Sequence, residues 1–554
     1  MTGSANPKNG PRSVSREFVS KVHRAWGESP FYQSRLNGPA PDRLYVIPSD
    51  PYTADVEFAN SFLAGRMALA GETLDCDGEI SSAWQRIEPA SPMWKFMHEF
   101  AWARHLAALG DDAQRPARAI LASWLDLHEK WSPVAWTPTL TGERLLNICA
   151  HGPLFLRGGD ALWRSRVLTS LARQTRHLAN SAHRADSGLE KLMAATALAI
   201  TGYCLPGCEA EGERGLELVR RETRLQILPD GGHESRNPAA QLAISIRIQS
   251  IFNTLEQRNI PAPGFLRNIE LRTSAMARFF RVADGRIAVF HGGNEGDAKA
   301  VIAAQTGASE EVTPTGYAKY SGYQKLTGGR SLVIFDVAPT QGGVSGFNSV
   351  GSFHFSDGRS RMITNCGNGG HLGRKWQRAT RAAAAHSTLS FGEGGAHKVV
   401  FSKTSHQRGE ETNGQLVEFT AFADPENPIG FEYSRRLFLS SGGTDLRGED
   451  RLVRIPSDLR DDACWRFHFH PGIRASLARD RKSVLLALPS REGWRFRASG
   501  ADISIEKSIY FQESGLPIAT EQIVMTPNRG AFREDVDGTS HLSVKWAFKR
   551  QASV

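Results

Sequence analysis

The sequence predicts an all-helical N-terminal region followed by an all-β C-terminal region built as an antiparallel β-sandwich. Apolar residues recur at three-to-four spacing from about residue 91 to residue 283, which is the period of helices buried on one face. After Asp284-Gly285, glycine and β-forming residues dominate, and polar and apolar residues alternate as they do in strands. No helical stretch separates these strands, so the sheets are expected to be antiparallel.

The helical stripes are separated by short connectors. Trp94, Met97 and Phe100 begin one stripe, and Gly110-Asp-Asp and Leu205-Pro-Gly are two of the connectors. Consecutive helices with short loops pack antiparallel, which leaves a bundle, a solenoid or a toroid open.

The strand pattern is clearest in Ser331-Leu-Val-Ile-Phe-Asp and Trp465-Arg-Phe-His-Phe-His. Many short strands of this kind, without intervening helices, favour a sandwich over a parallel sheet. We therefore divide the chain into a partly disordered arm (residues 1–39), a helical domain (residues 40–284) and a β-sandwich domain (residues 285–554).

The charge of the chain favours an anionic partner. Its 554 residues carry a formal net charge of +9, and a basic surface attracts nucleic acid, anionic lipid or acidic polysaccharide. The sequence has no run of five Lys or Arg residues, no zinc-finger spacing and no RNA-binding motif, so nucleic acid is not expected. No stretch reaches the roughly 18 apolar residues of a membrane span.

The cysteines and the N-terminus bear on the compartment. Six widely spread cysteines do not indicate a disulfide framework. The first residues, MTGSANPKNGPRS, lack an apolar signal segment. The sequence therefore predicts a cytoplasmic protein, or a periplasmic or cell-envelope protein if the true start differs.

One motif resembles a known family. Arg381-Ala-Ala-Ala-Ala-His386-Ser-Thr-Leu-Ser is similar to the His-Ser/Asn-Thr-Leu signature of bacterial heparinase II/III-type polysaccharide lyases. Arg374-Lys-Trp-Gln-Arg378 before it, and Asp230-Gly-Gly-His233-Glu-Ser-Arg236-Asn-Pro238 far upstream, resemble further segments of that family. The likeness runs from about residue 40 to the end.

The resemblance implies an α/α toroid followed by an antiparallel β-sandwich, and an enzyme that cleaves uronate polysaccharides by β-elimination. Such a carbon–oxygen lyase must neutralise the uronate carboxylate, remove the neighbouring proton and protonate the leaving oxygen. It requires no cofactor. The expected partner is an acidic polysaccharide or oligosaccharide, for example a glycosaminoglycan.

His386, His233 and Arg236 are the candidate catalytic residues. His386 fits the base, and four cations precede it within twelve positions; the alternative is a surface loop with a solvated charge run. His233 and Arg236 could bind the carboxylate; the alternative is that Glu234, Ser235 or Asn237 caps the following helix.

The expected substrate-binding residues are Arg374, Arg378, Arg381 and Asn237. Arg offers a fork that matches a carboxylate or sulfate. If residues 374–381 form a helical turn, the three arginines share one face, which favours sugar binding; in an extended segment they cannot all do so.

A structural zinc ion is a further hypothesis, because some relatives hold one in this domain. His386 and His468 are its candidate ligands, and no Asp at a suitable position completes the set. The alternative is that His468 and His470 are ordinary histidines at a sheet face.

The chain also departs from the family pattern. Active relatives carry an Asn-His pair on a toroid helix, where this chain reads Ser187-Gly-Leu-Glu-Lys, and a Tyr shortly after the Arg-Ser-Pro loop, where it reads Ala239-Ala-Gln. Three hypotheses remain: a lyase with a variant site, a carbohydrate-binding protein without activity, and a hydrolase using toroid carboxylates such as Glu143 and Glu190.

Overall fold

The structure is a computed structural model that describes residues 24–306, 314, 316–340, 346–392, 399–423, 431–455, 459, 461–512, 515–534 and 540–551. The predicted N-terminal arm therefore lies largely outside the described residues. The chain forms two compact units. The helical unit contains the described residues up to Leu225 and the segment Arg247–Leu266, and the sandwich unit contains Gln226–Ile246 and the described residues from Arg267 onward.

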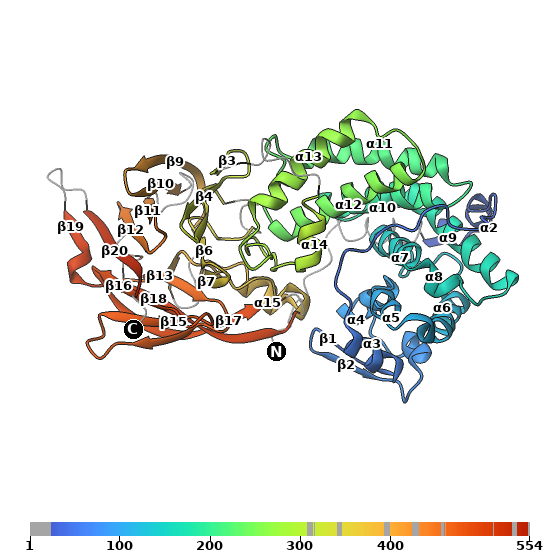
Figure 1. Ribbon diagram of the computed structural model, residues 1–554, viewed down its shortest axis with the longest axis horizontal. Helices are drawn as coiled ribbons and strands as arrows, with labels where there is room; N and C mark the ends of the chain where they lie inside the picture. Colours follow the sequence, from blue (N-terminus) through green and yellow to red (C-terminus); the bar gives the residue numbers. More distant parts are fainter. Residues whose placement is uncertain are drawn as a thin grey trace, which may run out of the picture. The chain divides into compact units, whose positions relative to one another are not determined.

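Helices make up most of the helical unit (Figure 1). They are α2 (Pro30–Arg35), α3 (Val56–Leu63), α4 (Pro92–His98), α5 (Ala103–Ala107), α6 (Gln114–His128), α7 (Pro138–Ala150), α8 (Gly152–Leu156), α9 (Ala161–Ser181), α10 (Gly188–Cys204) and most of α11 (Glu209–Gln226), and α12 (Pro238–Gln257) ends there. Helices α7 and α10 approach closely because Gly142 has no side chain: an added Cβ would lie 3.0 Å from that of Ala197.

A short hairpin interrupts the helical unit, and here the all-helical prediction was wrong. Strands β1 (Arg66–Leu69) and β2 (Glu72–Asp75) pair antiparallel. Ala70 and Gly71 between them both have positive φ, 52° and 85°. A two-residue turn of this kind matches the twist of a hairpin, so the local turn outweighs the helical context.

Two antiparallel sheets follow the helices in the sandwich unit, which begins with part of α12, with α13 (Gly264–Phe279) and with α14 (Ala298–Ala303). The first sheet has the order β17-β18-β13-β7-β6-β5-β4-β3 and the second β14-β15-β16-β20-β12-β11-β10-β9; β8 pairs with β13 and β19 with β20. The strands are β3 (Tyr317–Ala318), β4 (Tyr323–Gly328), β5 (Ser331–Asp336), β6 (Phe353–Asp357), β7 (Ser360–Thr364), β8 (Leu389–Phe391), β9 (Phe401–Glu411), β10 (Gly414–Ala423), β11 (Glu432–Ser440), β12 (Asp445–Val453), β13 (Ala463–Phe469), β14 (Arg474–Leu477), β15 (Ser483–Ala487), β16 (Gly493–Ser499), β17 (Ala501–Phe511), β18 (Pro517–Pro527), β19 (Phe532–Glu534) and β20 (Ser540–Arg550).

The inward side chains of both sheets form one apolar core, and the Trp546 ring stacks on Phe353 within it. One ion pair is buried in this core. Arg435 and Asp450 are cross-strand partners, both fully buried, and Arg435 Nε donates to Asp450 Oδ1 at 2.6 Å. Tyr433 and Trp546 also donate to Asp450. The buried charge is thus satisfied on all sides, as burial requires.

The predicted fold class, helices followed by an antiparallel β-sandwich, is confirmed. The division into domains at residue 284 stays a prediction. Among the described residues, no helix is both long and apolar enough to cross a membrane.

Candidate functional site

His233 lies in a tight turn after α11. The residue is 3% exposed, and its Nε2 lies 3.0 Å from Gln226 Oε1 and its Nδ1 2.7 Å from Ser235 Oγ. Since the Gln226 oxygen can only accept, Nε2 carries the proton and Nδ1 accepts from Ser235. Burial lowers the pKa of His233 to about 4. Both ring nitrogens are therefore engaged within the protein, and the imidazole is neutral at pH 7.

Arg236 follows in the same turn and points into the protein. Its side chain is 1% exposed, and its guanidinium pairs with Asp336 and donates to the Ser321 carbonyl at 2.7 Å. The group also lies 5.0 Å from the centre of the Tyr323 ring. Burial alone would lower the pKa of Arg236, but the charge of Asp336 outweighs it and raises the pKa. The positive charge of Arg236 is thus neutralised internally.

Asn237 is the N-cap of α12. Its Oδ1 accepts from the Ala239 amide at 2.8 Å and from the Ala240 amide at 3.4 Å. This is the capping role that we considered as the alternative to sugar binding.

Asp336, at the end of β5, connects Arg236 to a second histidine. Its Oδ2 lies 3.0 Å from His291 Nε2 and accepts from Ser349 Oγ at 3.3 Å. Asp336 is fully buried, and although burial opposes ionisation, Arg236 and His291 hold its pKa below the usual range. The Ser349 hydroxyl lies 3.5 Å from His291 Nδ1, but it is fully buried and is not accessible as a nucleophile.

His386 lies close enough to this group for the charges of His291 and Asp336 to influence its pKa. Its Nδ1–H donates to the Ala382 carbonyl at 2.9 Å, so Nε2 is the acceptor nitrogen. The ring lies 6.1 Å from that of Phe347, which in turn lies 6.2 Å from that of His291. Burial lowers the pKa of His386 to about 4, so its imidazole too is neutral at pH 7.

The predicted basic cluster precedes His386 in the chain. Arg374 and Arg378 are exposed on the short helix α15 (Arg374–Ala379), four positions apart and hence on one face. Arg381 follows the helix, and its guanidinium lies 5.6 Å from the centre of the Phe347 ring. None of these three arginines forms an ion pair with the described residues. The helical turn that favours sugar binding is therefore present for the first two arginines.

The candidate zinc ligands His386 and His468 are not joined by further ligands among the described residues. His468 Nδ1 lies 2.7 Å from Ser508 Oγ, and burial lowers the pKa of His468 to about 3. In the part of the chain that the structure describes, no three His, Cys, Asp or Glu side chains are grouped to hold a metal ion. His386 and His468 therefore do not fit a zinc site here.

The sequence did not reveal a second polar cluster, which is centred on Glu295. Tyr510 donates to Glu295 Oε1 at 2.5 Å, and His470 Nε2 lies 2.7 Å from the same oxygen. Burial opposes the charge of Glu295, but the hydrogen bond from His470 and the nearby charge of Arg361 lower its pKa to about 2. Only His470 had been noted, because the other members are far away in the sequence.

The toroid carboxylates of the hydrolase hypothesis have structural partners. Glu190 and Ser187 form a capping box at the start of α10, and Glu143 pairs with Arg247. Near Glu143 lies Glu99, whose pKa burial raises to about 7.

Comparisons with known proteins agree with this architecture. Residues 311–547 match the family model "Heparinase II/III-like, C-terminal". FtsZ-localized protein C of Caulobacter vibrioides is 29% identical over 93% of this chain and 92% of its own length. A crystal structure of heparinase III covers 99% of this chain and 93% of its own with a TM-score of 0.70 at 13% identity. A heparan sulfate lyase HepC mutant from Pedobacter heparinus covers 99% and 92% with a TM-score of 0.60 at 14% identity. The structural likeness shows the fold.

Proposed function

We propose that this chain, which has the heparinase II/III-like fold, binds an acidic saccharide on its sandwich unit without cleaving it through His233 and Arg236. One observation carries the proposal. The Arg236 guanidinium is 1% exposed and paired with Asp336, whereas Arg374 and Arg378 are exposed and form no ion pair with the described residues. The available positive charge thus lies on α15 and not in the turn.

Elimination needs groups that Arg236 and His233 do not supply in this arrangement. A carboxylate neutraliser must reach the substrate with its charge uncompensated, and a general base needs a free nitrogen. Arg236 meets a carboxylate already inside the protein, and both nitrogens of His233 are hydrogen-bonded.

Binding needs less. Two exposed arginines on one helical face can each form forked hydrogen bonds with a carboxylate or sulfate. The Phe347 ring lies 5.6 Å from the Arg381 guanidinium and 6.1 Å from the His386 ring, and it offers an apolar surface next to Arg381. An acidic sugar could lie against this ring while α15 holds its charges.

Calorimetric titration and ultraviolet absorbance on a panel of uronate polymers test the proposal. We expect binding that weakens with salt, and no absorbance from a conjugated double bond. Arg374→Ala/Arg378→Ala should weaken binding severalfold, and Arg529→Ala, which removes an exposed arginine on the η8 turn (Arg529–Ala531), should not. Unchanged binding in the double variant would refute the assignment.

A polysaccharide lyase is the second candidate, and His386 is the observation that favours it. Its Nε2 is an acceptor with no hydrogen bond from the described residues, and its ring lies 6.1 Å from that of Phe347. With a pKa of about 4 it is a weak base at pH 7. Absorbance that develops with the wild type but not with His386→Ala, with binding retained, would establish this candidate instead.

We also infer a cellular setting from the relative named FtsZ-localized protein C. The likeness extends along nearly the whole of both chains, which supports a shared location with FtsZ, and with it the predicted cytoplasmic compartment. A fluorescent fusion should form bands that coincide with FtsZ and disperse when FtsZ is depleted. A fusion that stays diffuse, or that keeps its pattern after depletion, would count against it.

A further inference from the structure

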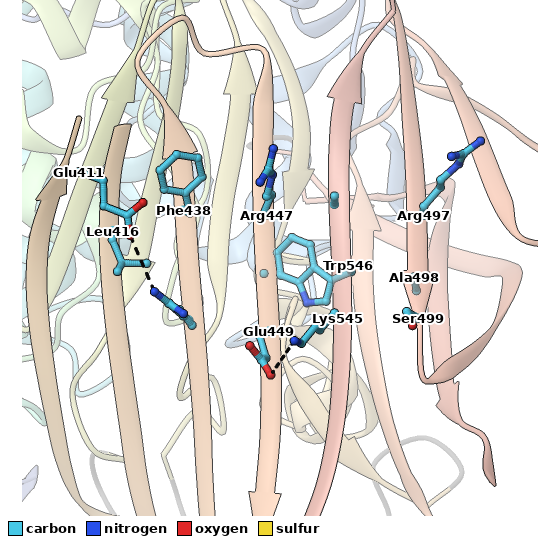
Figure 2. Close-up of a pocket in the computed structure, with 13 residues that line it drawn as sticks. Glu411, Leu416, Phe438, Arg447, Glu449, Arg497, Ala498, Ser499, Lys545 and Trp546 are labelled. Atoms are coloured by element: carbon cyan, nitrogen blue, oxygen red, sulfur yellow. Dashed lines mark ion pairs between the residues drawn. The ribbon is translucent and has the colours of Figure 1, made fainter. Parts of the chain in front are cut away.

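The outer face of the second sheet carries a hollow of about 680 Å³ that the proposed sugar site does not use. Figure 2 shows it lying across β9, β10, β11, β12, β20 and β16, with side chains standing out from the strands. The same strands send their alternate side chains into the core. Leu416, Phe438, Arg447 and Arg497 therefore stand on the solvent face, whereas Trp546, which also lines the hollow, belongs to the core.

One row of cross-strand neighbours gives the hollow an apolar half and a basic half. Leu416 pairs with Phe438, and Phe438 with Arg447. Arg447 pairs with Ala547, and Ala547 with Arg497. The row therefore begins with two apolar side chains and ends with two arginines, with the small Ala547 between them.

The two arginines stand two strands apart. Strands in a sheet are about 4.8 Å apart, so the backbones at Arg447 and Arg497 are separated by roughly 10 Å. Ala547 between them leaves room for a ligand group to reach the sheet.

The charged side chains of the next row of cross-strand neighbours pair with one another. Arg436 Nε lies 3.0 Å from Glu418 Oε1, and Lys545 Nζ lies 3.8 Å from Glu449 Oε1. These charges screen one another and leave little field for a partner.

Positive charge remains at the other end of the hollow. Arg497 is exposed, and neither it nor Lys549 on β20 forms an ion pair with the described residues. Arg447 pairs with Asp445 while its side chain stays 64% exposed. A partner that approaches this end therefore meets two cations without an ion pair among the described residues, Arg497 and Lys549, and the exposed guanidinium of Arg447, which is paired with Asp445.

We propose that this hollow binds an acidic polypeptide segment whose apolar side chain packs on Leu416 and Phe438 while its carboxylates meet Arg447 and Arg497. A polypeptide can place an aliphatic or aromatic group directly beside carboxylates. An acidic polysaccharide offers the charges but no aliphatic side chain for Leu416. The half-apolar, half-basic row therefore favours a polypeptide.

Fluorescence anisotropy on the full chain provides the test. The probe is a labelled synthetic peptide, Leu-Phe-Gly-Glu-Asp-Glu-Glu, and the comparison ligands are the same peptide with Ser in place of Leu and Phe, and a heparin oligosaccharide. We expect the first peptide to bind most tightly, with an affinity that falls as salt is added. Stronger binding of the heparin oligosaccharide at this face would overturn the proposal, as would equal binding of the Ser-substituted peptide.

Two variants and a matched control locate the site. Arg447→Glu/Arg497→Glu should lower the peptide affinity roughly tenfold or more, because like charges then face each other. Phe438→Ser should lower it at high salt as well as at low salt. Lys403→Glu/Arg529→Glu makes the same charge change at exposed positions outside the hollow and should have little effect. Equal losses in the control and in the arginine variant would show only a general effect of charge.

The two proposals can fail separately. Arg374→Ala/Arg378→Ala on α15 should leave peptide binding unchanged, and Arg447→Glu/Arg497→Glu should leave binding of the uronate polymers unchanged. If one pair of substitutions abolishes both activities in a protein that unfolds like the wild type, the hollow is not a separate site.

Discussion

Arg236 is expected to be needed for stability, and its replacement by Met tests this directly. The substitution would leave the Asp336 carboxylate, which is fully buried, without its cation, and would remove the 2.7 Å hydrogen bond to the Ser321 carbonyl. Removing one partner of a buried ion pair costs about 3–5 kcal/mol. For a domain of this size, that corresponds to a fall in Tm on the order of 10 °C.

Near-ultraviolet circular dichroism measures the effect, because several tryptophans lie in the core of the sandwich unit. Arg236→Met/Asp336→Leu should recover much of the loss, since no unpaired charge then remains. At a temperature where Arg236→Met is still folded, it should bind uronate polymers like the wild type. A wild-type Tm combined with lost sugar binding would refute the structural role and restore Arg236 as a substrate-binding residue.

The same pair sets a pH dependence. The folded-state pKa of Asp336 is depressed below its ordinary value of 3.8. Its contribution is therefore complete above that value and is lost as the pH falls through the folded-state pKa. The wild type should lose stability below about pH 4 more steeply than Arg236→Met/Asp336→Leu, as urea titrations across this range would reveal. Identical slopes would contradict the assignment.

Three other changes have expected outcomes. Ser187→Ala removes the capping box with Glu190 and should destabilise the helical unit by about 1 kcal/mol, seen as a lower urea midpoint; no change would mean that α10 does not depend on its cap. Glu99 has a folded-state pKa raised from 4.5 to about 7. Folding therefore favours its neutral form, and the helical unit should lose stability as the pH rises from 5 to 8. Glu99→Gln should remove this pH dependence of Tm, and a dependence that persists would belong to another group. Tyr510→Phe removes the hydrogen bond to Glu295 and should cost about 1.5–3 kcal/mol, as expected for a bond to a charged group; chemical unfolding of the sandwich unit measures it, and a neutral result would mean that water replaces the hydroxyl.

The sequence predicted what is encoded locally. The β-forming residues of Ser331–Asp336 and of Trp465–His470 predicted strands, and β5 and β13 lie there, with residues of both faces buried. The hairpin at residues 66–75 was missed because its four-residue strands are too short to show a period and Ala70 is not a usual turn residue.

The candidate site was harder to predict because its partners are remote. Arg236 and Asp336 are 100 positions apart, and Tyr510 and Glu295 are 215 apart, so no spacing rule connects them. The sequence analysis also expected His233 and Arg236, in a Gly-rich turn, to bind a carboxylate of the substrate. Only the tertiary structure shows that the side chains of that turn point inward.

The ion pair between Arg435 and Asp450 has a consequence for how the strands find their partners. The two residues face each other across β11 and β12, and a shift of one residue would turn every inward side chain outward. Apolar contacts alone discriminate weakly between strand registers, since one aliphatic contact resembles the next. A buried guanidinium discriminates strongly, because its carboxylate lies opposite it in one register alone. This pair therefore favours the observed register of β11 and β12 over shifted registers, in which the buried guanidinium would lack its carboxylate.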